Sequence, residues 1–158
     1  MDKIVNGKKI TAAVVIIDKD GNILGCHGTG KPKDSGYDFP KGCVEEGETD
    51  EFAAARELKE EANIYICDFE KPIFWNEFDR LIDCGIHPHN KEKNIHIFLY
   101  KTNSFPDLST LTCTTFFEGK NGKKYPEIDG YKIISKEERG MFNKVLQNKF
   151  DIIDSFNK

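Results

Sequence analysis

Three glutamates with helical spacing are the residues of this sequence whose arrangement most clearly suggests chemistry. Glu57, Glu60 and Glu61 stand at i, i+3 and i+4, so a helix over residues 49–62 places them on one face. Like charges at this spacing repel each other and destabilise a helix. Divalent cations such as Mg²⁺ prefer carboxylate and phosphate oxygens and would reverse that repulsion. The alternative is a solvated acidic face, because most charge runs only face water.

The helix that must carry these glutamates is delimited by its own sequence. Thr49 is a residue type that caps helix N-termini, and Asp50 and Glu51 follow it, where negative charge suits the helix dipole. Asn63 comes after the last helical residue, and Asn is common in the left-handed stop conformation. On the helical wheel, the opposite face carries side chains that we expect to pack on the core: Phe52, Ala55, Leu58 and Ala62.

The segments before and after this helix predict a mixed structure. Strands are expected over residues 11–17 and 22–27, joined by a two-residue hairpin turn at Asp20-Gly21. Residues 64–78 predict one or two further strands with Pro72 at an edge or bend. Residues 87–94 predict a polar loop that leads into a strand over 95–101.

The C-terminal third predicts a strand pair and a second helix. The strands are expected over residues 113–117 and 125–134, joined by a loop that contains Asn121-Gly122. Ser135 and Glu138 have the spacing of a capping box, which predicts a helix that runs to about Lys149.

Composition narrows the class of protein. The length of 158 residues suits one domain, 1–158, and the net charge of −4 gives no global attraction to nucleic acid or to an anionic membrane. The apolar run over residues 12–17 is too short for a membrane span. Five widely spaced cysteines without a CxxC pair indicate reduced thiols and a cytoplasmic location.

The segment from Gly42 to Ile64 resembles the Nudix box, G-x5-E-x7-R-E-U-x-E-E-x-G-U, in which U is aliphatic. Gly42-Cys-Val-Glu-Glu-Gly-Glu48 is followed after seven residues by Arg-Glu-Leu-Lys-Glu-Glu-Ala-Asn-Ile, residues 56–64. The one departure is Asn63, where the family has glycine, and Asn tolerates a left-handed stop at modest cost. Phe39-Pro-Lys-Gly42, just upstream, extends the likeness.

The resemblance implies an α+β fold, a Nudix-like α/β/α sandwich with a mixed central sheet and two main helices. It also implies an enzyme that acts on phosphoanhydride bonds with Mg²⁺, or alternatively Mn²⁺. The implied metal ligands, which also form the catalytic centre, are Glu57, Glu60, Glu61 and the backbone carbonyl of Lys41. Structural support is implied for Gly42, Glu48 and Arg56, and the salt-bridge partner of Arg56 is either Glu60 or Glu48.

Residues outside the box supply further candidates. Family members often place another catalytic glutamate in a loop after the box, and Glu127 is favoured over Glu118, with a simple turn residue as the alternative. Side chains that could bind substrate are the aromatics Tyr37, Phe39 and Trp75 and the lysines Lys31, Lys33 and Lys41, although a buried core position is the stronger expectation for Trp75. His87 and His89 are expected to be exposed histidines rather than a zinc site.

The box specifies a reaction type but not a substrate. Residues 78–81 carry neither the proline nor the tyrosine that marks family subgroups. The expected substrate is a nucleotide-like small molecule with a nucleoside diphosphate linkage: a dinucleoside polyphosphate, ADP-ribose or a nucleotide coenzyme. An RNA 5′ end is the alternative substrate, and a non-catalytic nucleotide-binding module is the alternative class. We expect no membrane partner, and a monomer or a homodimer.

Overall fold

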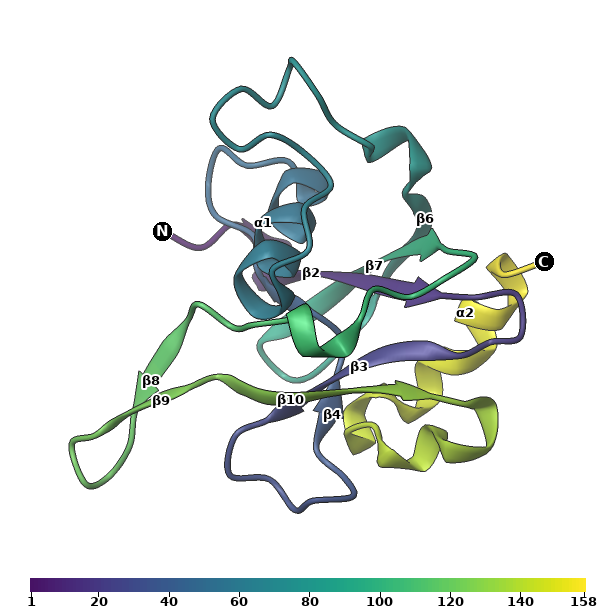
Figure 1. Ribbon diagram of the computed structural model, residues 1–158. Coiled ribbons are helices and arrows are strands. Elements are labelled where there is room, and N and C mark those ends of the chain that lie inside the picture. Colours follow the sequence, from purple (N-terminus) through teal and green to yellow (C-terminus); the bar gives the residue numbers. More distant parts are fainter.

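The computed structural model describes residues 1–158 and is built around a mixed β-sheet with the strand order β10-β3-β2-β7-β6 (Figure 1). Strand β2 (Lys8–Ile17) runs parallel to β7 (Lys93–Lys101). The outer strands pair antiparallel, β10 (Ile128–Ile134) with β3 (Ile23–Gly28) and β6 (Ile82–Pro88) with β7. Shorter strands extend this sheet: β1 (Ile4–Val5), β4 (Tyr37–Asp38) and β5 (Lys41–Cys43).

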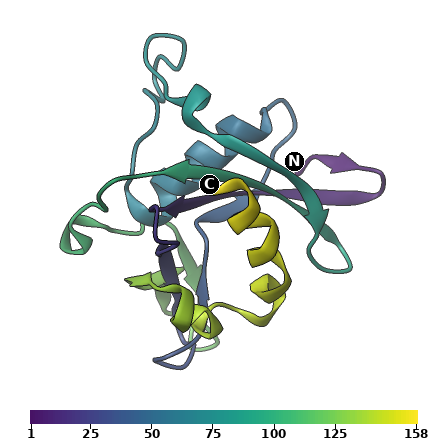
Figure 2. The same ribbon diagram turned by 90° about the vertical axis from the view of Figure 1, so that its right-hand side faces the viewer.

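Both faces of the sheet are covered, which gives three layers. Helix α1 (Asp50–Ala62) packs on one face, where alternate residues of β2 such as Ala12 and Val14 join its core. The other face, which includes Ala13 and Val15, packs against η4 (Lys144–Lys149) and α2 (Phe150–Phe156). Figure 2 shows the sheet between these layers. The predicted α+β sandwich is confirmed. Most residues of β2 are apolar, without polar alternation, because both faces of this strand are buried.

Helix α1 has the predicted bounds and the predicted caps. The hydroxyl of Thr49 accepts a hydrogen bond from the amide of Phe52. Asn63 is left-handed, with φ 58° and ψ 33°, and its amide donates to the carbonyl of Lys59. The predicted apolar face is buried except for Phe52, which lies at the edge of the core and packs on Phe69.

The predicted two-residue turn at Asp20-Gly21 is wrong. The turn is wider, because the carboxylate of Asp18 accepts hydrogen bonds from the amides of Asp20 and Asn22. Only Gly21 has a positive φ, of 83°, whereas a type I′ turn needs two such residues. Strands β2 and β3 pair only at Ile17 and Ile23, since β5 occupies the same edge of β2 further along.

The strands predicted over residues 64–78 are also absent. This segment is a loop with a single bridge between Cys67 and Asn76, and the carboxylate of Asp68 closes a turn by accepting from the amides of Glu70 and Lys71. A 3₁₀ turn, η1 (Phe78–Arg80), then leads into β6, which occupies the start of the predicted polar loop. A bulge within β6 disrupts the alternation that would have revealed the strand.

The predicted helix from Ser135 to Lys149 is wrong as well, although its capping box forms. The chain makes two 3₁₀ segments, η3 (Lys136–Met141) and η4, and becomes α-helical only in α2. Between them Phe142 and Asn143 are extended, with ψ angles of 150° and 145°. Phe142 packs on Phe39, and the amide of Asn143 donates to the carbonyl of Tyr37. These tertiary contacts override the local preference for helix.

The predicted strand over residues 125–134 is divided at Glu127. Its first part, β9 (Lys124–Pro126), pairs with β8 (Phe116–Glu118) around the predicted Asn121-Gly122 turn, and its second part is β10. A short 3₁₀ turn, η2 (Leu108–Thr110), precedes this hairpin. Figure 1 shows β8 and β9 extending away from the central sheet. No helix is long and apolar enough to cross a membrane.

Candidate active site

Glu61 anchors a group of carboxylates between α1 and the segment that contains β4 and β5. Its side chain is buried, and Oε1 accepts a hydrogen bond of 2.9 Å from the amide of Lys41. Burial raises the pKa of Glu61 to about 8, and the charges of Glu57 and Asp38 act in the same direction. A buried carboxyl group with acidic neighbours favours the proton until a cation compensates for the charge.

Glu57 lies one helical turn before Glu61 and against the backbone of Gly42. A β-carbon built on Gly42 would stand 2.1 Å from the Cδ atom of Glu57, so only glycine leaves room for this carboxylate. The pKa of Glu57 is raised to about 7, chiefly by burial; the charges of Glu60 and Glu127 act in the same direction, and Arg56 opposes them. The box glycine therefore determines where the carboxylate of Glu57 lies, because the glycine has no side chain to occupy that space.

Arg56 holds the box together through a guanidinium fork. Its Nε and Nη2 donate to the two carboxylate oxygens of Glu48 at 2.8 and 3.0 Å. Its Nη1 donates to Glu57 at 2.8 Å and, at a longer distance of 3.4 Å, to Glu60. Both expected partners thus contact Arg56, and Glu48 makes the bidentate pair. Such a fork fixes the orientation of the carboxylates that it contacts.

Glu127 reaches the same place from outside the box. Together with Glu61, Lys41 and Asp38 it lines a cavity of about 190 Å³, which we call the carboxylate cavity. Its amide donates to the carbonyl of Thr115, and its carbonyl accepts from the amide of Thr29. Glu118 is exposed on β8 and does not line this cavity. Of the two candidate glutamates, the fold brings Glu127 to the carboxylates.

The donors of the carboxylate cavity fit a hard divalent cation. They are the carboxylate oxygens of Asp38, Glu61 and Glu127, and burial raises the pKa of Asp38 and of Glu61. Glu57 and Glu60 belong to the same helix as Glu61 but do not line this cavity. No three acidic, histidine or cysteine side chains converge as a closed metal cage, since Glu57 is turned to Arg56 and Glu61 to the amide of Lys41. Mg²⁺ does not need such a cage, because it binds through one or two carboxylates, waters and substrate phosphates.

Of the three aromatic candidates, only Phe39 lines this cavity. Tyr37 and Phe39 are 8% and 1% exposed, and Phe39 packs on Phe142 and Phe150. The expectation that these two rings stack on a nucleobase is therefore wrong, because both rings are buried in the core. Trp75 is 44% exposed, so the expected core position is wrong, but it lies on the loop after α1 and does not line the carboxylate cavity.

The basic candidates are divided in a similar way. Lys31 and Lys41 line the carboxylate cavity, and Nζ of Lys41 forms an ion pair of 3.2 Å with Asp38. Lys33 is exposed and does not line it. His87 and His89 are partly buried rather than exposed. His87 contacts the carbonyl of Cys84 at 2.7 Å, and burial lowers the pKa of His89 to about 4.

Two residues of this site were missed in the sequence, namely Asp38 and Asn143. Burial raises the pKa of Asp38, and Nδ2 of Asn143 donates to its carboxylate at 3.3 Å. Asp38 directly precedes the Phe39-Pro-Lys-Gly42 segment, which was a usable signal. Nothing local marks Asn143, because it is 105 residues away and lies where a helix was expected.

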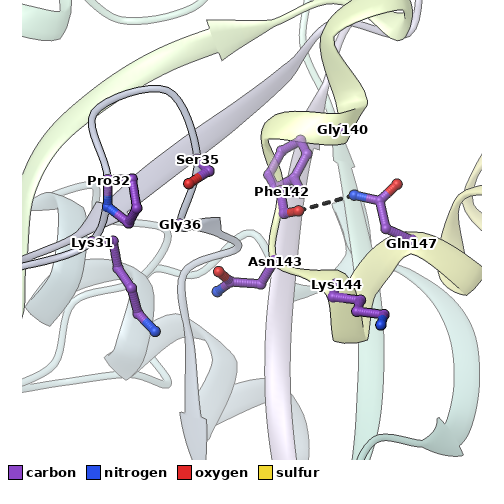
Figure 3. Close-up of a pocket in the computed structure, with 9 residues that line it drawn as sticks. All are labelled: Lys31, Pro32, Ser35, Gly36, Gly140, Phe142, Asn143, Lys144 and Gln147. Atoms are coloured by element: carbon purple, nitrogen blue, oxygen red, sulfur yellow. Dashed lines mark hydrogen bonds between the residues drawn. The ribbon is translucent and has the colours of Figure 1, made fainter.

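A second cavity, of about 570 Å³, adjoins the first and shares Lys31, Gly36 and Asn143 with it. We call it the outer cavity. Figure 3 shows that the loop between β3 and β4, with Pro32 and Ser35, forms one wall. Residues 140–147 form the opposite wall, where the amide of Gln147 donates to the carbonyl of Phe142. The lining is mostly polar, and its volume is that of a typical small-molecule site.

The NUDIX domain family profile matches residues 7–138, which is most of the chain. The chain belongs to the Nudix family. It is a hydrolase of phosphoanhydride bonds. A curated relative is an uncharacterized 17.7 kDa protein in the e-segB intergenic region of Enterobacteria phage T4, which is 28% identical over 137 residues, 82% of this chain and 83% of the relative.

Solved structures share the fold of this Nudix hydrolase. A bifunctional NMN adenylyltransferase/ADP ribose pyrophosphatase from Francisella tularensis has a TM-score of 0.65 and 17% identity over 99% of this chain, which spans only 43% of that protein. It was also solved with AMP and a manganese ion. A MutT protein from Methanosarcina mazei Go1 has a TM-score of 0.61 and 17% identity, and 99% of each chain is covered. A C. elegans Ap4A hydrolase has a TM-score of 0.60 and 21% identity, over 92% of this chain and 94% of that one.

Proposed function

We propose that this Nudix hydrolase is a Mg²⁺-dependent pyrophosphohydrolase that cleaves a nucleoside-diphosphate-linked substrate: a dinucleoside polyphosphate, ADP-ribose or a nucleotide coenzyme. The observation that carries this proposal is the continuity of the two cavities through Lys31, Gly36 and Asn143. When the diphosphate of the substrate binds at the carboxylates, the nucleoside attached to it lies in the outer cavity. The names of the Francisella and C. elegans proteins, which act on ADP-ribose and Ap4A, support this substrate class.

The outer cavity has the chemistry of a nucleoside site. Lys31 and Lys144 supply two cations, and Ser35 supplies a hydroxyl that can bond to a sugar or a base edge. Both amide hydrogens of Gln147 are directed to backbone carbonyls, of Arg139 and Phe142, so this side chain supports the wall. Polar groups on a shaped wall orient a ligand and select it against others.

The box glutamates and the residues of the carboxylate cavity divide the catalytic work. Glu57, Glu60 and Glu61 would hold the cation, with the carbonyl of Lys41 as a further ligand, and Arg56 and Glu48 keep those carboxylates in place. Bound Mg²⁺ supplies charge neutralisation of the diphosphate and a lowered pKa of a bound water. Glu127, which lines the cavity, accepts the proton of the attacking water. Lys31 and Lys41 meet the phosphate oxygens of the substrate.

A substrate panel with Mg²⁺ tests this function. ADP-ribose, diadenosine polyphosphates, dinucleotide coenzymes, nucleoside triphosphates and 5′-triphosphate RNA are compared by kcat/KM. We expect release of a nucleoside monophosphate from at least one member of the first three classes. Hydrolysis of nucleoside triphosphates alone would contradict the proposed substrate class. No hydrolysis of any compound would favour a nucleotide-binding module, against which the three box glutamates argue.

The cation is tested separately, by Glu60→Gln and Glu61→Gln. Each change keeps the shape of the side chain and removes one ligand charge, so we expect turnover to fall by more than about tenfold and to need more Mg²⁺ or Mn²⁺. Glu51→Gln is the matched control, because Glu51 lies on the same helix but in its first turn. Unchanged turnover and unchanged metal dependence in both site variants would remove these residues from the metal site.

The proposal also includes the cellular location and the oligomeric state of the protein. All five cysteines are free, which suits the reducing cytoplasm. We propose that the protein acts there, on small nucleotides, as a monomer or a homodimer. Sedimentation velocity at two protein concentrations measures the oligomeric state.

A further inference from the structure

The loop between β3 and β4, residues 29–35, forms a wall of both cavities. Lys31 lines the carboxylate cavity and the outer cavity, and Ser35 lines the outer one (Figure 3). The loop is closed at its neck, where the amide of Gly28 donates to the carbonyl of Gly36 at 3.0 Å. Most of its residues are exposed, so packing in a core does not determine where Lys31 and Ser35 lie.

Beyond this neck, only two hydrogen bonds tie the loop to the rest of the protein. The amide of Thr29 donates to the carbonyl of Glu127 at 3.1 Å. Nε2 of His27 donates to the carbonyl of Pro32, which directly follows Lys31, at 2.8 Å. His27 is therefore the side chain that holds the middle of the loop against the sheet.

The side chain of His27 is itself fixed from two sides. It is 8% exposed, and the ring of Tyr37 lies edge-on to it at a centroid distance of 5.0 Å. Its Nδ1 lies 2.5 Å from Oδ1 of Asp129. Asp129 is the extra residue of a β-bulge in β10, between Ile128 and Gly130, and such bulges redirect a side chain. The bulge thus brings a carboxylate to the ring that holds the loop.

Both contacts of the ring require that His27 is protonated. A carbonyl oxygen and a carboxylate oxygen accept hydrogen bonds, so each ring nitrogen must carry a proton. Burial lowers the pKa of His27, but the hydrogen bonds to Pro32 and Asp129 outweigh burial and raise that pKa above its ordinary value. Asp129 on β10 and Tyr37 on β4 are the titratable side chains that face the ring. A neutral ring has one proton and keeps the stronger bond, to the charged carboxylate, so it releases Pro32.

The segment over residues 127–129 links the loop to the candidate base. The carbonyl of Glu127 holds Thr29. Two residues later, Asp129 holds Pro32 through His27. His27 lines neither cavity, so it does not touch a substrate bound there. Its effect on a substrate must therefore pass through the loop.

We propose that His27 is a positioning residue for nucleotide binding, which fixes the loop over residues 29–35 so that Lys31 meets the substrate phosphates and Ser35 meets the nucleoside. The inference rests on the proposed function for the place of the nucleotide. It adds a residue that controls affinity rather than the chemical step. When the ring of His27 loses its second proton, or when its side chain is changed, the loop is released and the Kd for nucleotides rises.

The matched pair His27→Asn and His27→Gln tests this role, because each amide replaces one ring nitrogen. The amide nitrogen of Asn stands near the place of Nδ1 and that of Gln near the place of Nε2, so only Gln can still donate to Pro32. Isothermal titration calorimetry with Mg²⁺ and α,β-methylene-ADP, whose P–C–P bridge is not hydrolysed, measures binding without turnover. The Kd should rise about tenfold in His27→Asn, as expected when only about a tenth of the molecules keep the loop in place, and less than about threefold in His27→Gln.

A double-mutant cycle shows whether His27 acts through the loop. Lys31→Ala should raise the Kd by itself, and His27→Asn/Lys31→Ala should bind more tightly than the product of the two single effects predicts, because both changes remove the same contact. His87→Asn is the matched control, since Nε2 of His87 also contacts a backbone carbonyl, that of Cys84, but His87 lines neither cavity. The control should bind like wild type.

The pH dependence supplies a readout that a purely structural role would not change. The Kd of wild type should rise relative to that of His27→Gln from pH 6 to pH 9, because the ring loses its second proton while the amide of Gln does not titrate. With the best small substrate of the panel, His27→Asn should raise KM about tenfold and change kcat by less than about twofold.

Three results would overturn the inference. The first is wild-type protein that binds α,β-methylene-ADP no more tightly than His27→Asn does. The second is full additivity of the changes at His27 and Lys31. The third is a constant ratio of the Kd values of wild type and His27→Gln from pH 6 to pH 9, a comparison that does not depend on the folding of His27→Asn. If no compound of the panel is hydrolysed while His27→Asn still weakens binding of α,β-methylene-ADP, the proposed function fails and this inference stands.

Discussion

The carboxylate of Glu57 rests against the α-carbon of Gly42, in the space that any other residue would fill with its β-carbon. That β-carbon would stand 2.1 Å from Cδ and from Oε1 of Glu57. The φ of Gly42 is not positive, so the position needs glycine for its missing side chain and not for its backbone freedom. The first glycine of the Nudix box thereby determines where a candidate metal ligand lies.

The variant Gly42→Ala should disturb the active site without disturbing the fold. The methyl group meets the far end of a flexible side chain, so Glu57 can move away while the strands stay in place. We expect turnover to fall about 10- to 100-fold, the usual cost of displacing a metal ligand. The melting temperature should change by less than about 4 °C, equivalent to about 1 kcal/mol for a chain of this size.

Gly130→Ala is the control, because a β-carbon there meets only Cβ of His27, at an ordinary contact distance of 3.8 Å, and Gly130 lines neither cavity. Activity assays and thermal melts of the two variants are compared. Full activity in Gly42→Ala would mean that the position of Glu57 does not matter for the reaction. A melting temperature lowered by more than 10 °C would mean that the glycine serves the fold instead.

Sequence analysis succeeded where the information was local. Helix α1, its Thr49 cap and its Asn63 stop follow from residues that lie next to each other, and so does the carboxylate face. The failures arose where distant residues decide the structure. The helix expected after Ser135 is broken because Phe142 and Asn143 bind to Phe39 and Tyr37, more than 100 positions away. No local pattern contains such contacts.

Asn63 offers a direct test of the residue by which this box departs from its family. It has φ 58° and ψ 33°, where glycine is free of strain and a β-branched residue clashes. Asn63→Gly should therefore be neutral or stabilising by less than about 1 kcal/mol, and Asn63→Val should destabilise the protein by about 1–2 kcal/mol. Thermal melts measure both. Equal melting temperatures for the two variants would be incompatible with a left-handed residue at this position.

The ion pair of Arg139 and Asp154 predicts a pH-dependent stability. The buried guanidinium donates to both oxygens of Asp154, at 2.6 and 2.8 Å, and to the carbonyl of Gly21 at 3.0 Å. These hydrogen bonds hold the pKa of Asp154 below its ordinary value. Asp154→Asn should cost about 1.5–3 kcal/mol near neutral pH, the range for hydrogen bonds to charged groups.

The sign of the pH effect follows from that lowered pKa. The stabilisation is complete above the unfolded pKa of Asp154, about 3.9, and is lost as the pH falls through the lower folded value. Urea denaturation of wild type and Asp154→Asn should therefore give a constant difference from pH 5 to pH 8 and a shrinking one below about pH 4. Asp151→Asn, an exposed neighbour on α2, is the control. A difference as large at pH 3 as at pH 7 would refute the ionic origin of the effect.

Glu127 and Glu118 give the sharpest test of how the reaction obtains its base. Glu127 lines the carboxylate cavity and raises the pKa of Glu57, whereas Glu118 lies nine residues earlier on the exposed strand β8. Proton transfer by a positioned carboxylate is worth about 10²–10⁴-fold in rate. Glu127→Gln should therefore lower kcat by about 10²-fold or more with little change in melting temperature, and Glu118→Gln should change neither.

A pH profile of kcat distinguishes a base from a residue that only shapes the cavity wall. If Glu127 accepts the proton, the acidic limb of the wild-type profile disappears or shifts in Glu127→Gln, and the remaining activity is insensitive to pH in that range. A structural role lowers kcat at every pH by the same factor. The reverse order of the two variants would assign the role to Glu118. Wild-type rates in both would place the base within the box, where Glu57 is the first candidate because its pKa is raised to about 7.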